Sequence, residues 1–487
     1  MEYEAVIGLE VHAQIHTQSK MFCGCPIKPD TGNLEPNMYV CPICLALPGT
    51  LPVVNRRAVE MGMLAGLALN CTISPINVFS RKSYFYPDLP KGYQISQYDL
   101  PLAVDGYLEV EVEGERRRIG VHRAHLEEDT GKLYHMEDGS VMVDFNRAGV
   151  PLLEIVSEPD MHSVAEVQAY ATGLHEVLVY LGINSGDMEK GVMRFEANVS
   201  VRPQGQAELS TRTEIKNLNS FRALTRGVAY EIERQIAVLE TGGVIQQQTM
   251  GWDESEERTY PQRSKEFAHD YRYFPEPDIP PLEIEAAWIE QVQAQVPELP
   301  LAKKRRLIAT YDIRPYDAEL LVSTQAIANY FETAAEQACE ANIAPQEVAN
   351  WITGELFRLM NENGQEITEL SVAPEKLVDL IKLREAGAVS ITAAKQVLSE
   401  IFETGEDPQE AMKRLGLAQI SDTDALASVI QKVIAENPKQ VGQYLAGKTQ
   451  VIGWFIGQVM KETRGKANPQ TTRELVQHEL EHTRSEA

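Results

Sequence analysis

The sequence has no long apolar run and few cysteines. No stretch of its 487 residues approaches 18 consecutive apolar residues, so no membrane-spanning helix is expected. Six cysteines are too few for a disulfide framework in a chain of this length and are expected to be thiols or metal ligands. The first residues show no charged segment followed by an apolar one, so no secretory signal is predicted and the expected location is cytoplasmic.

Positive charge is also scarce. The formal net charge is -26, which argues against a broadly basic surface that coats nucleic acid without specificity. Basic residues do gather locally, because residues 439–473 contain six Lys or Arg and one Glu. A folded RNA could therefore still be held on a local basic patch.

Several catalytic signatures are missing as well. The chain lacks the Gly-Gly-Ser-Ser run of amidases and the glycine fingerprint of dinucleotide-binding folds. Residues 442–449, GQYLAGKT, do match the P-loop pattern. A P-loop follows a strand, whereas the residues before this one have a helical pattern that Pro438 ends. We therefore expect a basic turn between helices.

The pattern along the chain predicts an α+β protein. Residues 1–292 carry strand alternation and two helices, which begin after Ser163 and Ser220. Four prolines between residues 275 and 281 end this part in an extended segment. The remainder is helical and is interrupted near 405–420, so we expect domains at 1–292, 293–409 and 410–487.

The predicted strands have one apolar and one polar face. Glu10, His12 and Gln14 share a face in the first strand, and Arg194, Glu196 and Asn198 share one in another. An antiparallel sheet with one solvated face explains this pattern. A sheet whose polar face is a working surface explains it too, and accounts better for the choice of Arg, Glu, Asn and His.

Two close cysteine pairs predict a metal knuckle at residues 23–44. Cys23 and Cys25 form a C-x-C pair, and Cys41 and Cys44 form a C-x-x-C pair fifteen residues later. Two such pairs supply the four thiolates of a structural Zn²⁺ site. The first pair is tighter than usual, and four buried free thiols are the alternative. Cys71 and Cys339 are isolated and are expected to be ordinary thiols.

Carboxylates with histidine form a second candidate constellation. Oxygen-rich sites with one imidazole suit Mg²⁺ or Mn²⁺ in phosphoryl chemistry, and nearby cations could neutralise phosphate. The candidate acidic and histidine residues are Glu10, His12, His125, Glu127, Glu128, Asp129, Asp144, Glu154 and Glu158, and the cations are Arg81, Lys82, Lys91 and Arg147. An acidic protein scatters carboxylates widely, so no single pair is specific.

Long motifs resemble the B subunit of aspartyl/glutamyl-tRNA amidotransferases. They lie at residues 6–12, 81–97, 125–129, 144–155, 214–221, 271–278 and 457–469, so the resemblance covers the whole chain. The resemblance implies a cradle on an antiparallel sheet, related to glutamine synthetase, followed by a helical domain and a helical tail. It also implies ATP-dependent phosphorylation of the side-chain carboxylate of Glu-tRNA(Gln) or Asp-tRNA(Asn), and then amidation by ammonia.

The resemblance also implies partners and cofactors. A glutaminase A subunit would supply the ammonia and a small C subunit would complete a heterotrimer, with tRNA(Gln) or tRNA(Asn) as substrate. ATP, Mg²⁺ and Zn²⁺ are the expected cofactors. Some members of this family lack the four cysteines, whereas this chain has them all. A related subunit specific for Glu-tRNA(Gln) carries a synthetase-like insertion that is missing after Pro281.

By motif match, the resemblance assigns roles to individual residues. The expected catalytic and Mg²⁺-binding residues are Glu10, His12, Glu128 and Glu154, with Glu127 as the rival of Glu128. The expected residues of the ATP, substrate or ammonia path are Lys82, Tyr84, Lys91, Arg147, Glu196 and Asn198. This chain has Glu196 where the family often has Asp. The expected tRNA contacts are Lys448, Lys461 and Lys466. A non-catalytic tRNA-binding scaffold remains the alternative function.

Overall fold

The computed structural model describes residues 2–28, 34–262, 271–419, 423–463 and 467–486. The chain divides into two compact units, Met1–Ala302 and Lys303–Ala487. The first contains the sheets and the second is helical, which confirms the predicted α+β class. In the parts of the chain that are described, no helix combines the length and the apolar character needed to cross a bilayer.

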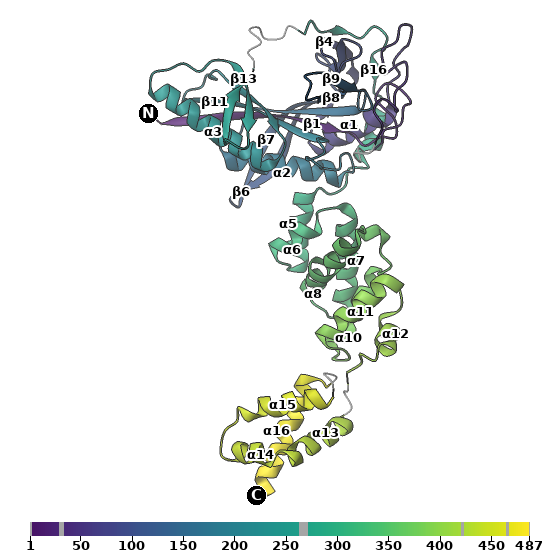
Figure 1. The fold of residues 1–487 in the computed structure, drawn as a ribbon, viewed down its shortest axis with the longest axis vertical. Helices are drawn as coiled ribbons and strands as arrows, with labels where there is room; N and C mark the ends of the chain where they lie inside the picture. The colour runs from purple at the N-terminus through teal and green to yellow at the C-terminus, as the bar shows by residue number, and fades with distance from the viewer. Residues whose placement is uncertain (1, 29–33, 263–270, 420–422, 464–466, 487) are drawn as a thin grey trace. The chain divides into compact units, whose positions relative to one another are not determined.

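A large sheet with β1 near its middle forms the first unit (Figure 1). In spatial order its described strands are β14 (Arg258–Pro261), β13 (Gln248–Asp253), β12 (Thr213–Leu218), β11 (Met193–Pro203), β1 (Tyr3–Gln14), β10 (Pro151–Ser157), β7 (Glu115–Glu128), β6 (Ala103–Val112) and β2 (Thr72–Ile73). Its pairs are antiparallel except β12 with β13, so the expected antiparallel sheet needs one correction. The helix α3 (Phe221–Glu240) connects these two strands, and a helical crossover permits parallel pairing.

Smaller sheets and helices flank the large sheet. The small sheets are β15 (Phe274–Pro275) with β4 (Phe79–Ser83) and β5 (Tyr93–Gln97), β16 (Leu282–Glu283) with β3 (Ile76–Asn77), and β8 (Lys132–His135) with β9 (Val141–Asp144). The other helices of this part are α1 (Arg56–Ala68), α2 (Val164–Tyr180) and α4 (Ala286–Gln293). The helices α2 and α3 begin after Ser163 and Ser220 as predicted. Ser163 forms a capping box with Glu166, and the Ser220 side chain caps α3.

The helices α2 and α3 run along one side of the sheet (Figure 1) and bury its apolar face. Leu9 and Val11 of β1 and Phe195 of β11 are essentially inaccessible and share one core with Leu174 of α2 and Leu224 of α3. Because side chains alternate along a strand, the polar residues of β1 and β11 must lie on the opposite face. The core therefore positions the candidate site.

The second unit is built from helices. They are α5 (Pro300–Tyr311), α6 (Pro315–Leu321), α7 (Gln325–Glu340), α8 (Pro345–Asn350), η1 (Trp351–Leu356), α9 (Phe357–Asn363), η2 (Ile367–Glu369), α10 (Pro374–Glu385), α11 (Ile391–Thr404), α12 (Pro408–Arg414), α13 (Thr423–Glu436), α14 (Pro438–Leu445), α15 (Val451–Glu462) and α16 (Pro469–Glu486). One buried cluster spans Leu307 to Met412, and another spans Leu426 to Leu480. The exact domain boundaries at 292 and 409 stay a prediction.

The P-loop match is not a P-loop in this structure. The first half of residues 442–449 is the end of α14, and the described residues before it form α13 and α14 without a strand. Only Gly447 has the left-handed conformation of a turn, with φ of 93°. The expected turn between helices is confirmed.

Candidate functional site

Strand pairing brings four polar side chains into one row across the sheet. On β1, His12 lies opposite Glu154 of β10 on one side and Arg194 of β11 on the other. Glu154 in turn lies opposite His125 of β7. These residues are far apart in sequence, and only the register of the four strands collects them on the face away from α2 and α3.

His12, Glu127 and Glu154 form a compact cluster, which we call the histidine–carboxylate cluster. His12 Nε2 lies 3.3 Å from a carboxylate oxygen of Glu154 and 3.6 Å from one of Glu127. Glu127 is 1% exposed, and its Oε2 atom is buried without a hydrogen-bond partner among the described residues. His125 Nε2 lies 4.0 Å from this oxygen but makes no hydrogen bond to it. A buried carboxylate oxygen without a hydrogen bond is costly, so this donor set suits a bound cation.

Positive charge partly balances this cluster. Burial alone would lower the pKa of His12, but Glu154 and Glu127 outweigh it and raise that pKa to about 9. Burial opposes ionisation of Glu154 as well, but His125 and His12 hold its pKa well below the usual range. Lys82 shows the same balance, because Glu127 and Glu154 raise its pKa despite burial.

A second carboxylate cluster lies beside the first. It contains Glu10, Glu196 and Glu214, each with a carboxylate oxygen within 4.8 Å of the others. Asn198 donates a hydrogen bond of 2.9 Å to Glu10, and Lys216 donates to Glu196 at 2.8 Å and lies 3.2 Å from Glu214. Burial and the charges of Glu154 and Glu196 raise the pKa of Glu10.

A cavity of about 150 Å³ opens at the second cluster, and Glu10 and Asn198 line it together with Arg212. Of the expected residues, Glu10 thus accepts a hydrogen bond from Asn198 and lies with a carboxylate oxygen within 4.8 Å of one of Glu196. Glu10 had been expected in one ligand set with His12. It belongs instead to the neighbouring cluster.

Glu128 does not share a face of the sheet with His12 and Glu154, with which it was predicted to bind Mg²⁺. Along β7, Glu127 is opposite Leu152 and Glu128 is opposite Pro151, so the two side chains leave the strand on opposite sides. The carboxylate of Glu128 accepts a hydrogen bond from Lys91 at 2.7 Å and one from the Ile95 backbone at 3.0 Å. The expectation that Glu128 joins His12 and Glu154 is corrected, and its rival Glu127 takes that place.

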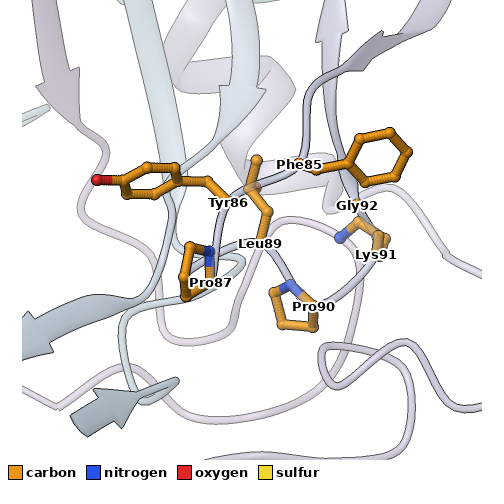
Figure 2. Close-up of a pocket in the computed structure, with 7 residues that line it drawn as sticks. All are labelled: Phe85, Tyr86, Pro87, Leu89, Pro90, Lys91 and Gly92. Carbon is orange, nitrogen blue, oxygen red and sulfur yellow. The ribbon is translucent and has the colours of Figure 1, made fainter. Parts of the chain in front are cut away.

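Lys91 lies in the loop of residues 85–92 (Figure 2). This loop surrounds an open pocket of about 470 Å³, in which Phe85 and Tyr86 point away from one another. Lys91 and Glu128 also line a second cavity of about 220 Å³ that reaches Cys23 and Cys44. The expected path residue Lys91 is thus held by Glu128 at a cavity wall, away from the histidine–carboxylate cluster.

Lys82 and Tyr84 lie nearer to that cluster, since the charge of Glu127 acts on both. The Lys82 ammonium lies 5.1 Å from the centre of the Tyr271 ring, and Tyr84 packs edge-on against Tyr271 at 5.9 Å. Arg147 donates to the carbonyl oxygens of Thr130 and Gly131. Arg147 therefore fastens the segment after β7, while Lys82 carries its charge towards the carboxylates.

The four predicted cysteines converge. Their sulfur atoms all lie within 4.8 Å of one another, with 4.0 Å between Cys25 and Cys44 and 3.9 Å between Cys41 and Cys44. A tetrahedral zinc site with Zn–S bonds of about 2.3 Å has sulfur–sulfur edges of about 3.8 Å. A disulfide would need about 2.05 Å. This geometry fits four ligands of one Zn²⁺.

The sequence matches two known family domains in chain order. Residues 5–290 match the family described as the GatB/GatE catalytic domain, and residues 329–480 match the one described as the GatB domain. The chain belongs to the GatB family. The catalytic-domain match includes every residue of both carboxylate clusters and the four cysteines.

Relatives in the GatB family are similar over nearly their whole length. The proteins from Thermoanaerobacter sp. (strain X514) and Moorella thermoacetica are each 52% identical, over 99% of this chain and 100% of the relative. The protein from Roseiflexus castenholzii is 51% identical over 99% of both chains. All three are named as the B subunit of aspartyl/glutamyl-tRNA(Asn/Gln) amidotransferase.

The predicted tRNA contacts lie in the part that matches the second GatB family domain. Lys448 follows α14 and Lys461 is in the last turn of α15, and both are exposed. Lys466 lies outside the described residues. Exposure leaves Lys448 and Lys461 accessible to a phosphate backbone.

Sequence reasoning placed His125 and Asp129 among the candidates without giving them a role, and it did not single out Lys216. His125 Nε2 lies 3.3 Å from Glu154, Asp129 pairs with Arg194 at 3.3 Å, and Lys216 bridges Glu196 and Glu214. The alternation of β7 was a usable signal for His125, since it shares a face with Glu127. The pairing of Asp129 with Arg194 and the bridge from Lys216 to Glu196 and Glu214 join different strands, so these contacts could not be predicted from the sequence.

The raised pKa of His12 predicts a pH-dependent stability. A raised pKa means that the charged imidazole stabilises the fold fully below its unfolded pKa near 6.5, and that this stabilisation is lost as the pH rises through about 9. In chelator-treated protein, His12 should lower the free energy of unfolding in urea by up to about 3 kcal/mol between pH 6.5 and pH 9.5. The variant His12→Gln should not show this decrease. His122→Gln, which breaks an exposed pair with Glu158, should leave the dependence intact.

Proposed function

We propose that this chain is the activating subunit of a tRNA-dependent amidotransferase that produces Gln-tRNA(Gln) or Asn-tRNA(Asn). The relatives named as the B subunit of such an enzyme match it over their whole length. The observation that carries the proposal is the histidine–carboxylate cluster beside Lys82, in the segment that matches the GatB/GatE catalytic domain. The sheet that carries it would serve as a cradle of the glutamine synthetase type.

The proposed reaction has two displacements. A side-chain carboxylate oxygen of Glu-tRNA(Gln) or Asp-tRNA(Asn) attacks the γ-phosphorus of ATP, and ADP leaves. Ammonia then attacks the acyl carbon, phosphate leaves, and the amide loses a proton to solvent. Neither step needs a covalent protein nucleophile, but both need positive charge near the phosphoryl group, which Lys82 supplies.

The two carboxylate clusters would hold the cation that accompanies ATP. His12, Glu127 and Glu154 are the first donor set, and Glu10 with Glu196 and Glu214 is the second. Bound Mg²⁺ would neutralise charge on the phosphate oxygens. Asn198 holds Glu10 in place, and His125 holds Glu154, so both orient carboxylates rather than react.

Ammonia and the remaining subunits come from outside this chain. The relatives are named as a subunit, which supports the presence of further chains in the complex. We propose a glutaminase A subunit as the ammonia source and a small C subunit as the third member. The cavity of about 220 Å³ that Lys91 and Glu128 line is our candidate for part of the ammonia path.

The first test of this function separates activation from glutamine hydrolysis. In the reconstituted complex, His12→Ala should lower phosphate release on misacylated tRNA about a hundredfold or more, because a ligand of the proposed cation is lost. Basal glutaminase activity of the partner should persist. Normal transamidation by the variant would favour the non-catalytic scaffold.

Two adjacent residues supply a matched control. Glu127→Gln should impair phosphate release as His12→Ala does, because Glu127 lies in the histidine–carboxylate cluster. Glu128→Gln should leave phosphate release with added ammonium salt near the wild-type rate, because Glu128 pairs with Lys91 on the other face. The opposite ranking would restore Glu128 as the ligand.

The cysteine geometry predicts one tightly bound zinc per chain. Elemental analysis of freshly purified, reduced protein should find about one Zn, and Cys41→Ser should lower that content and loosen residues 20–45 in hydrogen exchange. Phosphate release should change less than in His12→Ala. Cys339→Ser, at an exposed cysteine of α7, is the control that should keep its zinc. Zinc-free wild-type protein would exclude this site.

The exposed lysines of the second unit should bind tRNA without taking part in chemistry. Lys448→Ala with Lys461→Ala should raise the KM for tRNA and reduce the salt slope of binding by about one for each lysine. The turnover number at saturating tRNA should stay close to wild type, because ground-state and transition-state binding fall equally. A raised KM confined to ATP would instead mean that this turn binds nucleotide.

A further inference from the structure

Two tyrosines form a parallel ring stack at the surface of the first unit. The centroids of Tyr98 and Tyr273 are 4.2 Å apart and their planes differ by 5°. Tyr98 directly follows β5 and is 46% exposed. Because Tyr273 supports one side of the Tyr98 ring and the residue is this exposed, Tyr98 has surface available for another flat group.

Ring contacts connect this stack to the histidine–carboxylate cluster. Tyr273 packs edge-on against Tyr271 at 5.9 Å, and Tyr271 lies beneath the Lys82 ammonium at 5.1 Å. Burial, together with the charges of Glu154 and Glu127, raises the pKa of Tyr273 to about 12, although Lys82 opposes this shift. Tyr98 is therefore the exposed end of an aromatic series that reaches the reacting region.

The chemistry of the substrate requires a nucleoside near this region. The carboxylate to be activated belongs to an amino acid that is esterified to the ribose of the terminal adenosine of tRNA. Its base must then lie within one ribose and one aminoacyl group of the carboxylate clusters. Aromatic side chains bind single-stranded bases by stacking, regardless of sequence.

We propose that Tyr98, held by Tyr273, is the stacking platform for the base of the 3′-terminal adenosine of tRNA. This inference rests on the proposed function and adds the place where the acceptor end is held. An exposed platform suits the end of a macromolecule, most of which stays outside the site.

The test compares two RNAs on two variants of the full complex. Intact tRNA should bind the wild-type complex about tenfold more tightly than tRNA that lacks its terminal adenosine, as expected for one base stack. Tyr98→Leu should weaken binding of intact tRNA about tenfold and leave the truncated tRNA unchanged. Tyr98→Phe keeps the ring and should behave as wild type for both RNAs.

Steady-state kinetics and assembly separate the proposal from its alternatives. Tyr98→Leu should raise the KM for misacylated tRNA, leave the KM for ATP unchanged and assemble normally. The control is Tyr107→Leu on β6. The Arg118 guanidinium lies over the Tyr107 ring, and this variant should have wild-type KM values for both substrates. An equal loss for both RNAs, an effect on ATP alone or a weaker complex would each overturn the platform.

If the wild-type complex does not transamidate, the proposed function itself fails. If it does, and Tyr98→Leu still distinguishes the two RNAs as wild type does, only the stacking inference fails. The binding assay with uncharged RNA needs no activation step. The two results are thus independent.

Discussion

The apolar face of β1 constrains the rest of the site. Leu9, Val11 and Ala13 must pack against the helices, and the alternation of a strand then sends Glu10 and His12 to the other face. Neighbouring strands obey the same rule, so their polar residues meet on that face too. Register is strongly specified because a slip of one residue would exchange the two sets.

Charge balance is the second constraint on this face. Glu127 and Glu154 are almost fully buried, and isolated carboxylates in such places would be protonated or would destabilise the fold. His12, His125 and Lys82 offset part of that cost, while Lys216 does the same for Glu196 and Glu214. The Oε2 atom of Glu127 has no hydrogen-bond partner among the described residues, and this is the observation behind the proposed cation.

The rest of the first unit arranges access to this charged surface. Cys23 and Cys44 line the same cavity as Lys91 and Glu128, so the proposed zinc site would lie beside the proposed ammonia path. The small sheet of β4, β5 and β15 carries Lys82 and places the tyrosine series next to it. In our proposals, activation of the carboxylate, ammonia delivery and substrate positioning use different side chains of one framework.

The sequence by itself determined the class of fold, the faces of β1 and β11, the capped helices and the cysteine set, because each depends on local periodicity or short spacing. It also carried motifs long enough to identify the family. It could not decide whether Glu127 or Glu128 lies beside His12 and Glu154, because the two side chains differ only in which face of β7 they extend from. That choice was made by the pairing of β7 with β10 and of β10 with β1, which set Glu127 beside residues 12 and 154 and turned Glu128 towards Lys91. The contacts of His12 with Glu127 and Glu154 join residues more than a hundred positions apart, and only the tertiary structure brings them together.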